Sequence, residues 1–143
     1  MLILAFLAAA QAATGPSEVK AFGDWAAACD NLRYCEAASL MADETLDNVP
    51  QIAIVRDGGP GGTVSIEISP DAEYRGDYAI EIDGRTVLSG KMGGASATIG
   101  GADAIRLVDA MLKGQALAMR GGGKLLSQAS LKGISATDRK SVV

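Results

Sequence analysis

Histidine is missing from this 143-residue chain. Its absence removes the general base of Ser-His-Asp and Cys-His catalysis, because both mechanisms need an imidazole that accepts a proton near neutral pH. It also removes the ligand on which most zinc sites depend. We therefore expect no catalytic residue, no metal and no other cofactor in this chain, and we predict that the protein is not an enzyme.

Other scarcities narrow the class of protein further. Basic residues form no cluster and the formal net charge is −4, so the chain has little with which to neutralise phosphates, and nucleic-acid binding is not expected. No apolar run approaches the roughly 20 residues of a membrane-spanning helix. Aromatic residues make up only 4% of the chain, whereas glycines number 18, which favours an aliphatic core and many tight turns.

The N-terminus has the pattern of an export signal. Leu2 to Ala10 is a short apolar run, and small residues at Ala10 and Ala12 bracket Gln11 as signal peptidase requires. No Lys or Arg precedes the run, which a start codon placed too late would explain. We predict a cleaved signal peptide over residues 1–12 and a periplasmic or secreted protein. The alternative is a buried first strand or helix of a cytosolic domain.

The last six residues, Asp138 to Val143, differ in character from the rest of the chain. They are what GATCGGAAGAGCGTCGTG encodes, a sequence that resembles the start of a widely used sequencing adapter. We interpret residues 138–143 as an artefact of that kind, with an ordinary polar C-terminus as the alternative. A single β-rich domain is then expected over residues 13–137.

Both cysteines and the only tryptophan lie close together, between Trp25 and Cys35. Cys29 and Cys35 flank Asp30 and Asn31, which favour turns, so the segment predicts a hairpin. In an exported chain we expect a structural disulfide, which would close a small loop and contribute about 2.4 kcal/mol through chain entropy. A redox pair lacks its usual Cys-x-x-Cys spacing here, and two thiols without histidine make a poor metal site.

Alternating apolar and polar residues predict half-buried strands along most of the chain. These strands are Trp25 to Cys29, Tyr34 to Leu40, Gln51 to Arg56, Thr63 to Ser69, the segment around Tyr78 to Ile82, a return strand at Val87 and Leu88 after the Asp83-Gly84 turn, Ala97 to Ile99, Gln115 to Arg120 and Lys124 to Leu131. The predicted class is α+β, mainly β with one α-helix. We expect an antiparallel sandwich or a barrel-like sheet covered by that single helix.

The helix is predicted from Asp103 to Lys113. Its expected apolar stripe consists of Ile105, Val108, Met111 and Leu112. Gly114 is expected to end the helix as a left-handed cap.

Other motifs have structural interpretations that are simpler than functional ones. Trp25 could stack on a sugar or a peptide, but a tryptophan ahead of a stapled hairpin is more often part of the core. Asp30 is more often a turn residue than a catalytic acid. The glycine runs at 57–62 and 121–124 lack the Gly-Lys-Ser or Gly-Lys-Thr of a phosphate loop and are predicted as turns. Trp25, Asp30 and Asn31 remain the candidate residues of a surface or core motif.

Two groups of carboxylates are further candidates for a site. Asp43, Glu44 and Asp47 lack the twelve-residue pattern of a calcium loop, which favours a solvated connection. Glu67 and Glu81 could face each other across neighbouring strands, as a glycosidase requires. Both lie on polar faces of alternating strands, so ordinary exposure to solvent is the expected state.

Three motifs carry a family resemblance: Phe22-Gly-Asp-Trp25, Cys29-Asp-Asn-Leu-Arg-Tyr-Cys35 and Ser130-Leu-Lys-Gly-Ile-Ser-Ala136. They resemble a family of exported bacterial proteins known only as domain of unknown function 1176. The first and third are also similar, more distantly, to motifs of the invasion-associated locus B family. The resemblance implies a periplasmic location, a β-rich fold and no known catalytic residues. It also implies that this chain is the N-terminal portion of a longer protein.

These observations together predict an exported binding or envelope-associated protein whose partner is an envelope protein or a glycan. The oligomeric state stays open. The alternative is the N-terminal part of a periplasmic enzyme whose catalytic groups lie partly in a missing C-terminal region. A redox sensor would require Cys29 and Cys35 to cycle between thiol and disulfide.

Overall fold

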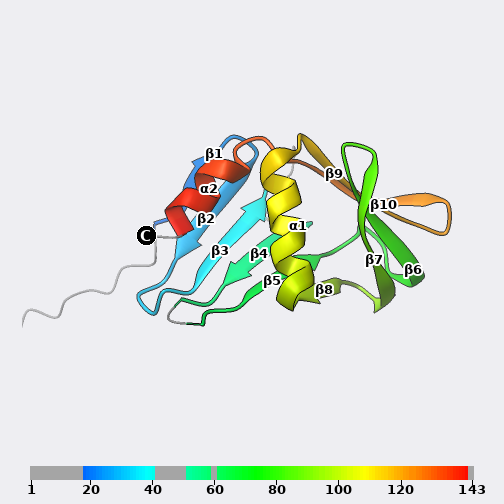
Figure 1. Ribbon diagram of the computed structural model, residues 1–143, viewed down its shortest axis with the longest axis horizontal. Helices are drawn as coiled ribbons and strands as arrows, with labels where there is room; N and C mark the ends of the chain where they lie inside the picture. Colours follow the sequence, from blue (N-terminus) through cyan, green and yellow to red (C-terminus); the bar gives the residue numbers. More distant parts are fainter. Residues whose placement is uncertain (1–17, 41–50, 59–60, 142–143) are drawn as a thin grey trace, which may run out of the picture.

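The computed structural model describes residues 18–40, 51–58 and 61–141. The predicted signal peptide and the acidic segment with Asp43, Glu44 and Asp47 lie outside these residues. Within them the chain forms two antiparallel sheets and two helices (Figure 1). The predicted class, mainly β with α-helix, is confirmed.

The larger sheet has six strands in the order β1-β2-β3-β4-β5-β8. Its strands are β1 (Lys20–Phe22), β2 (Trp25–Cys29), β3 (Cys35–Ser39), β4 (Ile52–Arg56), β5 (Val64–Ile68) and β8 (Ala97–Gly100). The two-residue period of the sequence places Ile52, Ile54, Ile66 and Ile68 on one buried face. Both helices cover that same face (Figure 1).

The smaller sheet has four strands in the order β10-β9-β6-β7. Its strands are β6 (Tyr74–Ile82), β7 (Arg85–Gly94), β9 (Ala116–Gly121) and β10 (Lys124–Ser130). The predicted Asp83-Gly84 turn joins β6 to β7, with φ of 51° at Asp83 and 82° at Gly84. Both sheets are open, and the described residues form no closed barrel.

β7 is longer than the predicted return strand at Val87 and Leu88, because it continues through a glycine-rich segment to Gly94. The ring of Tyr78 on β6 explains the glycine at position 90 of this segment. A Cβ at Gly90 would lie 2.7 Å from the hydroxyl of Tyr78, its partner across the two strands, so the ring occupies the place of the missing side chain. Burial, with a smaller contribution from the Asp103 carboxylate, raises the pKa of Tyr78.

Helix α1 (Gly101–Lys113) buries Val108 and Met111 of the predicted stripe, and Leu112 is half-buried, but Ile105 is not part of the buried face. Ala104, Leu107, Val108 and Met111 are buried, whereas Ile105 is 55% exposed. The prediction that Ile105 belongs to the buried stripe is therefore wrong. Ala104 and Leu107 take that place, at the spacing of one helical turn from Val108 and Met111.

Gly114 ends α1, but the predicted left-handed cap is wrong. Its φ of −102° and ψ of 174° are extended, and its N–H donates to the Met111 carbonyl over 3.3 Å. Lack of space explains the glycine, because a Cβ at this position would overlap Cγ2 of Ile82. The helix end therefore packs directly against β6.

Helix α2 (Ile134–Ser141) was not predicted. It lies over β1, β2 and β3 (Figure 1). Ile134 and Thr137 are buried beneath it, and the Thr137 hydroxyl donates to the Ile134 carbonyl over 2.6 Å. Residues 138–141, part of the predicted artefact, belong to α2, and their interpretation as an artefact stays a prediction.

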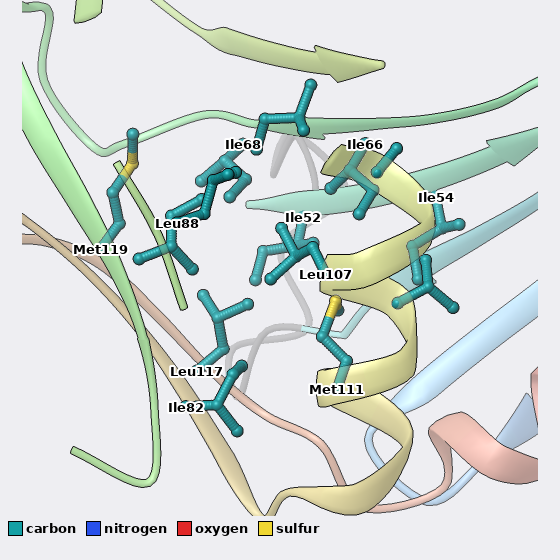
Figure 2. Close-up of a cluster of buried hydrophobic side chains, with 14 of the residues drawn as sticks. Ile52, Ile54, Ile66, Ile68, Ile82, Leu88, Leu107, Met111, Leu117 and Met119 are labelled. Atoms are coloured by element: carbon teal, nitrogen blue, oxygen red, sulfur yellow. The ribbon is translucent and has the colours of Figure 1, made fainter. Parts of the chain in front are cut away.

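The main core lies where α1, the larger sheet and the smaller sheet meet (Figure 2). Leu107 and Met111 of α1 point between the isoleucines of β4 and β5 on one side and the residues of β6, β7 and β9 on the other. The aliphatic core predicted from the low aromatic content is therefore present.

In the described part of the chain, neither helix has the length and apolar character needed to cross a membrane.

Candidate functional site

The predicted hairpin consists of β2 and β3, and a disulfide joins Cys29 to Cys35 at its end. The two cysteines lie directly opposite each other, with 4.0 Å between their Cα atoms. Cys35 is buried and Cys29 is half-buried. The bridge therefore fixes the register of the two strands immediately before the turn.

Asp30 shapes the turn that follows. Its Oδ1 accepts hydrogen bonds from the main-chain N–H groups of Leu32, at 2.8 Å, and Tyr34, at 2.9 Å. The Asp30 N–H donates to the Tyr34 carbonyl over 2.8 Å, which closes the loop. The carboxylate thus acts as the internal acceptor of an Asx-type turn, and Asn31 is exposed beside it.

A second loop supports the turn from the side. Arg33 has a φ of 66°, in the left-handed region that is uncommon for a residue with a side chain. Its main chain packs on Gly58, where an added Cβ would overlap the Arg33 carbonyl oxygen. The loop after β4 is itself closed by a 3.0 Å hydrogen bond from the Thr63 hydroxyl to Asp57. The packing of Arg33 on Gly58 thus braces the turn from the side, in addition to the disulfide that closes it.

This braced turn exposes two large apolar side chains. Leu32 is 83% exposed and Tyr34 is 40% exposed. We call the segment from Asp30 to Tyr34 the hairpin tip. Asp30 and Asn31 were predicted from the sequence as candidate residues, whereas Leu32 and Tyr34 were not. The signal that could have found them is an apolar residue placed inside a disulfide-closed polar turn, where no core can reach it.

Trp25 lies in the core, with no exposed surface. Its indole Nε1–H donates to the Ser130 carbonyl over 2.8 Å, across 105 positions of the chain. The ring therefore has no free face on which a sugar or a peptide could stack. Trp25 anchors the base of the hairpin rather than a ligand.

Two of the three motifs that carry the family resemblance contact each other. The Asp24 N–H donates to the Lys132 carbonyl over 2.9 Å, next to the bond from Trp25 to Ser130. Gly133 packs on the main chain of Phe22 so closely that a Cβ there would overlap the Phe22 carbonyl oxygen. The Phe-Gly-x-Trp and Ser-Leu-x-Gly motifs are thus the two halves of one packing contact that holds the hairpin to α2.

The structure does not bring the remaining candidates together. Glu67 lies on β5 of the larger sheet and Glu81 on β6 of the smaller one, where Glu81 pairs with Arg120 at 3.0 Å. The described residues contain no group of three or more Asp, Glu or Cys that could hold a metal ion.

The features above define a class: a small β domain of two open antiparallel sheets, with helices on one face and a stapled hairpin at one end. The chain belongs to the family described as Protein of unknown function (DUF1176), whose model matches residues 19–139. No curated protein sequence matches the chain. A crystal structure of invasion associated protein B from Bartonella henselae has the same fold, with a TM-score of 0.62 and 16% identity over 88% of this chain and 96% of that chain. The predicted family resemblance is confirmed.

The disulfide provides the first testable prediction. Replacing both cysteines, Cys29→Ser with Cys35→Ser, should lower the free energy of unfolding by about 2–5 kcal/mol, because the unfolded chain regains the freedom that the bridge removes. Urea denaturation of the variant and the unaltered protein measures the difference. A variant as stable as the unaltered protein would show that the bridge does not stabilise the fold.

Proposed function

We propose that this protein is an exported, envelope-associated binding module that presents its hairpin tip to a partner protein. The observation that carries the proposal is the 83% exposure of Leu32 at the tip of the loop that the disulfide, the Asp30 carboxylate and Gly58 all hold in place. A single exposed leucine on a mobile surface would need no explanation. Here three separate contacts hold the loop in place, yet the Leu32 side chain at its tip remains exposed to solvent.

Pre-organisation is what makes such a tip suited to binding. Ordering a loop on association costs about 0.5–1.5 kcal/mol for each side chain that is immobilised, and a loop that is already ordered avoids much of that cost. Burying a leucine side chain contributes about 1.5–3 kcal/mol. Tyr34 adds an aromatic ring with a polar end, the kind of residue enriched at interface centres. The expected partner surface is an apolar pocket with a polar rim.

The chemistry of the tip favours a protein over a glycan. Carbohydrate sites use an exposed aromatic face for stacking, whereas the only tryptophan of the chain is buried and the Tyr34 ring at the tip is only 40% exposed, beside the far more exposed aliphatic Leu32. The export of the module is supported by the disulfide, since such bridges persist mainly in oxidising compartments. A protein of the same fold is named for its association with invasion, which is in keeping with a role at the cell envelope.

A photo-crosslinking amino acid at position 32 tests the binding proposal in the native host. We expect one adduct of defined mass from position 32. The same amino acid at position 105 is the matched control, because Ile105 is also a large exposed apolar residue but lies on α1. Equal adducts from both positions, or none from position 32, would contradict the proposal.

The proposed periplasmic location is tested separately. Intact-mass measurement of the protein from a periplasmic fraction, alkylated during lysis, should show a chain that begins at Ala13 and carries no alkylated cysteine. Two alkylated cysteines in that sample would contradict the oxidised state, and absence of a chain that begins at Ala13 from the fraction would contradict the exported location.

A further inference from the structure

A shallow, open cleft of about 650 Å³ lies on the smaller sheet. The strands that line it, β6, β7 and β9, lie at the opposite end of the molecule from the hairpin tip (Figure 1). The lining of the cleft includes side chains from three neighbouring strands, those of Asp77, Ala79, Ser89, Lys91 and Arg120, and the main chain of Gly123 in the turn after β9. Tyr78 and Ile80, the neighbours of Ala79 on β6, are buried in the core. Because side chains alternate along a strand, Ala79 and the cleft lie on the outer face.

Small residues leave the middle of the cleft open. Ala79 pairs with Ser89 on one side and with Arg120 on the other, so these three residues form one row across β7, β6 and β9. The methyl group of Ala79 separates a hydroxyl from a guanidinium. At the rim, Gly123 has a φ of 73° and no atom within 4 Å of where a Cβ would stand. A ligand can therefore reach the row without displacing a side chain.

Arg120 is oriented within this cleft. Its Nε donates to Oε2 of Glu81 over 3.0 Å, and Glu81 is itself only 23% exposed. In the described part of the chain this is the only hydrogen bond of the Arg120 side chain, so its two terminal Nη groups are unused. A guanidinium held through Nε presents those two groups as a fork, the geometry that carboxylates and phosphates match.

Lys91 adds a second cation at the same cleft. Its Nζ lies 3.8 Å from Oδ1 of Asp77, and both side chains are at least 80% exposed. Such a pair is weak in water, so an anionic ligand can draw the ammonium away from Asp77 at little cost. The Ser89 hydroxyl and the Gly123 N–H make no hydrogen bond within the described residues and provide two further donors.

We propose that this cleft is a binding site for a small ligand that carries a carboxylate or a phosphate group, which Arg120 holds. Lys91 and Ser89 contact the other side of the anion, and Ala79 accommodates a small apolar part of the ligand. Glu81 acts as a positioning residue, because it fixes the guanidinium without contacting the ligand. The site is independent of the hairpin tip, so either proposal can fail alone.

Titration of the ¹⁵N-labelled protein, followed through its amide shifts, tests this site. The probes are N-acetylglycine as the carboxylate and methyl phosphate as the phosphate, each compared with sodium chloride at the same ionic strength. We expect saturable shifts at Ser89, Gly121 and Gly123 with at least one probe. The probe that produces them identifies which group the cleft accepts.

Arg120→Gln should weaken that binding by about tenfold or more, and Arg120→Lys by less, because lysine keeps the charge but loses the fork. Arg106→Gln is the matched control. Arg106 is also an exposed arginine paired with a carboxylate, Asp103 at 3.0 Å, but it lies outside the cleft on α1. The Arg106→Gln variant should bind the probe as tightly as the unaltered protein does. Shifts no larger than those with sodium chloride, or equal weakening by Arg120→Gln and Arg106→Gln, would overturn the proposal.

Discussion

Val108→Asp should leave the domain unfolded. Val108 is 4% exposed and lies on the face of α1 that covers the larger sheet, among isoleucines and leucines that offer no partner to a carboxylate. Burying an unpaired charge costs several kcal/mol even after the surroundings relax. Small domains are stable by only about 5–15 kcal/mol in total. Circular dichroism and urea denaturation measure the result.

Two variants separate the charge from the loss of packing. Val108→Ala removes two methyl groups and should cost about 2 kcal/mol, which leaves the protein folded. Ile105→Asp places the same charge on the same helix, but at a position that is 55% exposed, and should change the stability by less than about 0.5 kcal/mol. If Ile105→Asp unfolded the protein and Val108→Asp did not, the face assigned to α1 would be wrong.

These variants also bear on why the sequence predicted the helix and its buried residues Val108 and Met111 but placed Ile105 wrongly. The capping residues and the apolar spacing are local, so the helix from about Asp103 to Lys113 could be predicted. Its apolar residues, however, occupy more than one side, because Ala104, Ile105, Leu107 and Val108 follow one another closely. Periodicity alone cannot choose between two such faces. The choice depends on β5 and β8, which contact the helix only in the folded chain.

The longer strands were easier to predict from the sequence than β1 and α2. A period of two marks β4, β5 and β6 without any tertiary information. The three-residue β1 and the helix α2 lack such a signal. α2 is polar overall and forms where Ile134 and Thr137 find a place over β2, with the Thr137 hydroxyl bonded back to its own helix. Tertiary contact, not propensity, accounts for both elements.

The candidate sites also differ in whether their residues are close together in the sequence. The stapled hairpin is local, since Cys29, Asp30 and Cys35 lie within one short segment, and the sequence predicted it. The cleft joins Ser89 to Arg120 through strand pairing, and no spacing in the sequence indicates that these residues share a row. The bond from Trp25 to Ser130 is of the same long-range kind.

Among the glycines that the structure describes, Gly133 should be the most damaging to replace with alanine. Gly133 has a φ of 95°, a conformation that costs an L-residue about 1–2 kcal/mol. The added Cβ would also overlap the Phe22 carbonyl oxygen, and main chain cannot move aside as a flexible side chain can. Relief would require the segment around Lys132 to separate from Asp24, which breaks the bonds that hold Asp24 and Trp25. We expect a loss of about 3–5 kcal/mol in the free energy of unfolding.

Gly84→Ala is the matched control, because Gly84 has a φ of 82° with no atom within 4 Å of the added Cβ. It isolates the backbone strain and should cost only about 1–2 kcal/mol. The fluorescence of Trp25, the only tryptophan, reports the contact directly. In Gly133→Ala its emission should shift towards that of a solvated indole before global unfolding, whereas in Gly84→Ala it should not. Equal stability losses in the two variants, with unchanged Trp25 emission, would mean that the two family motifs do not hold each other in the folded protein.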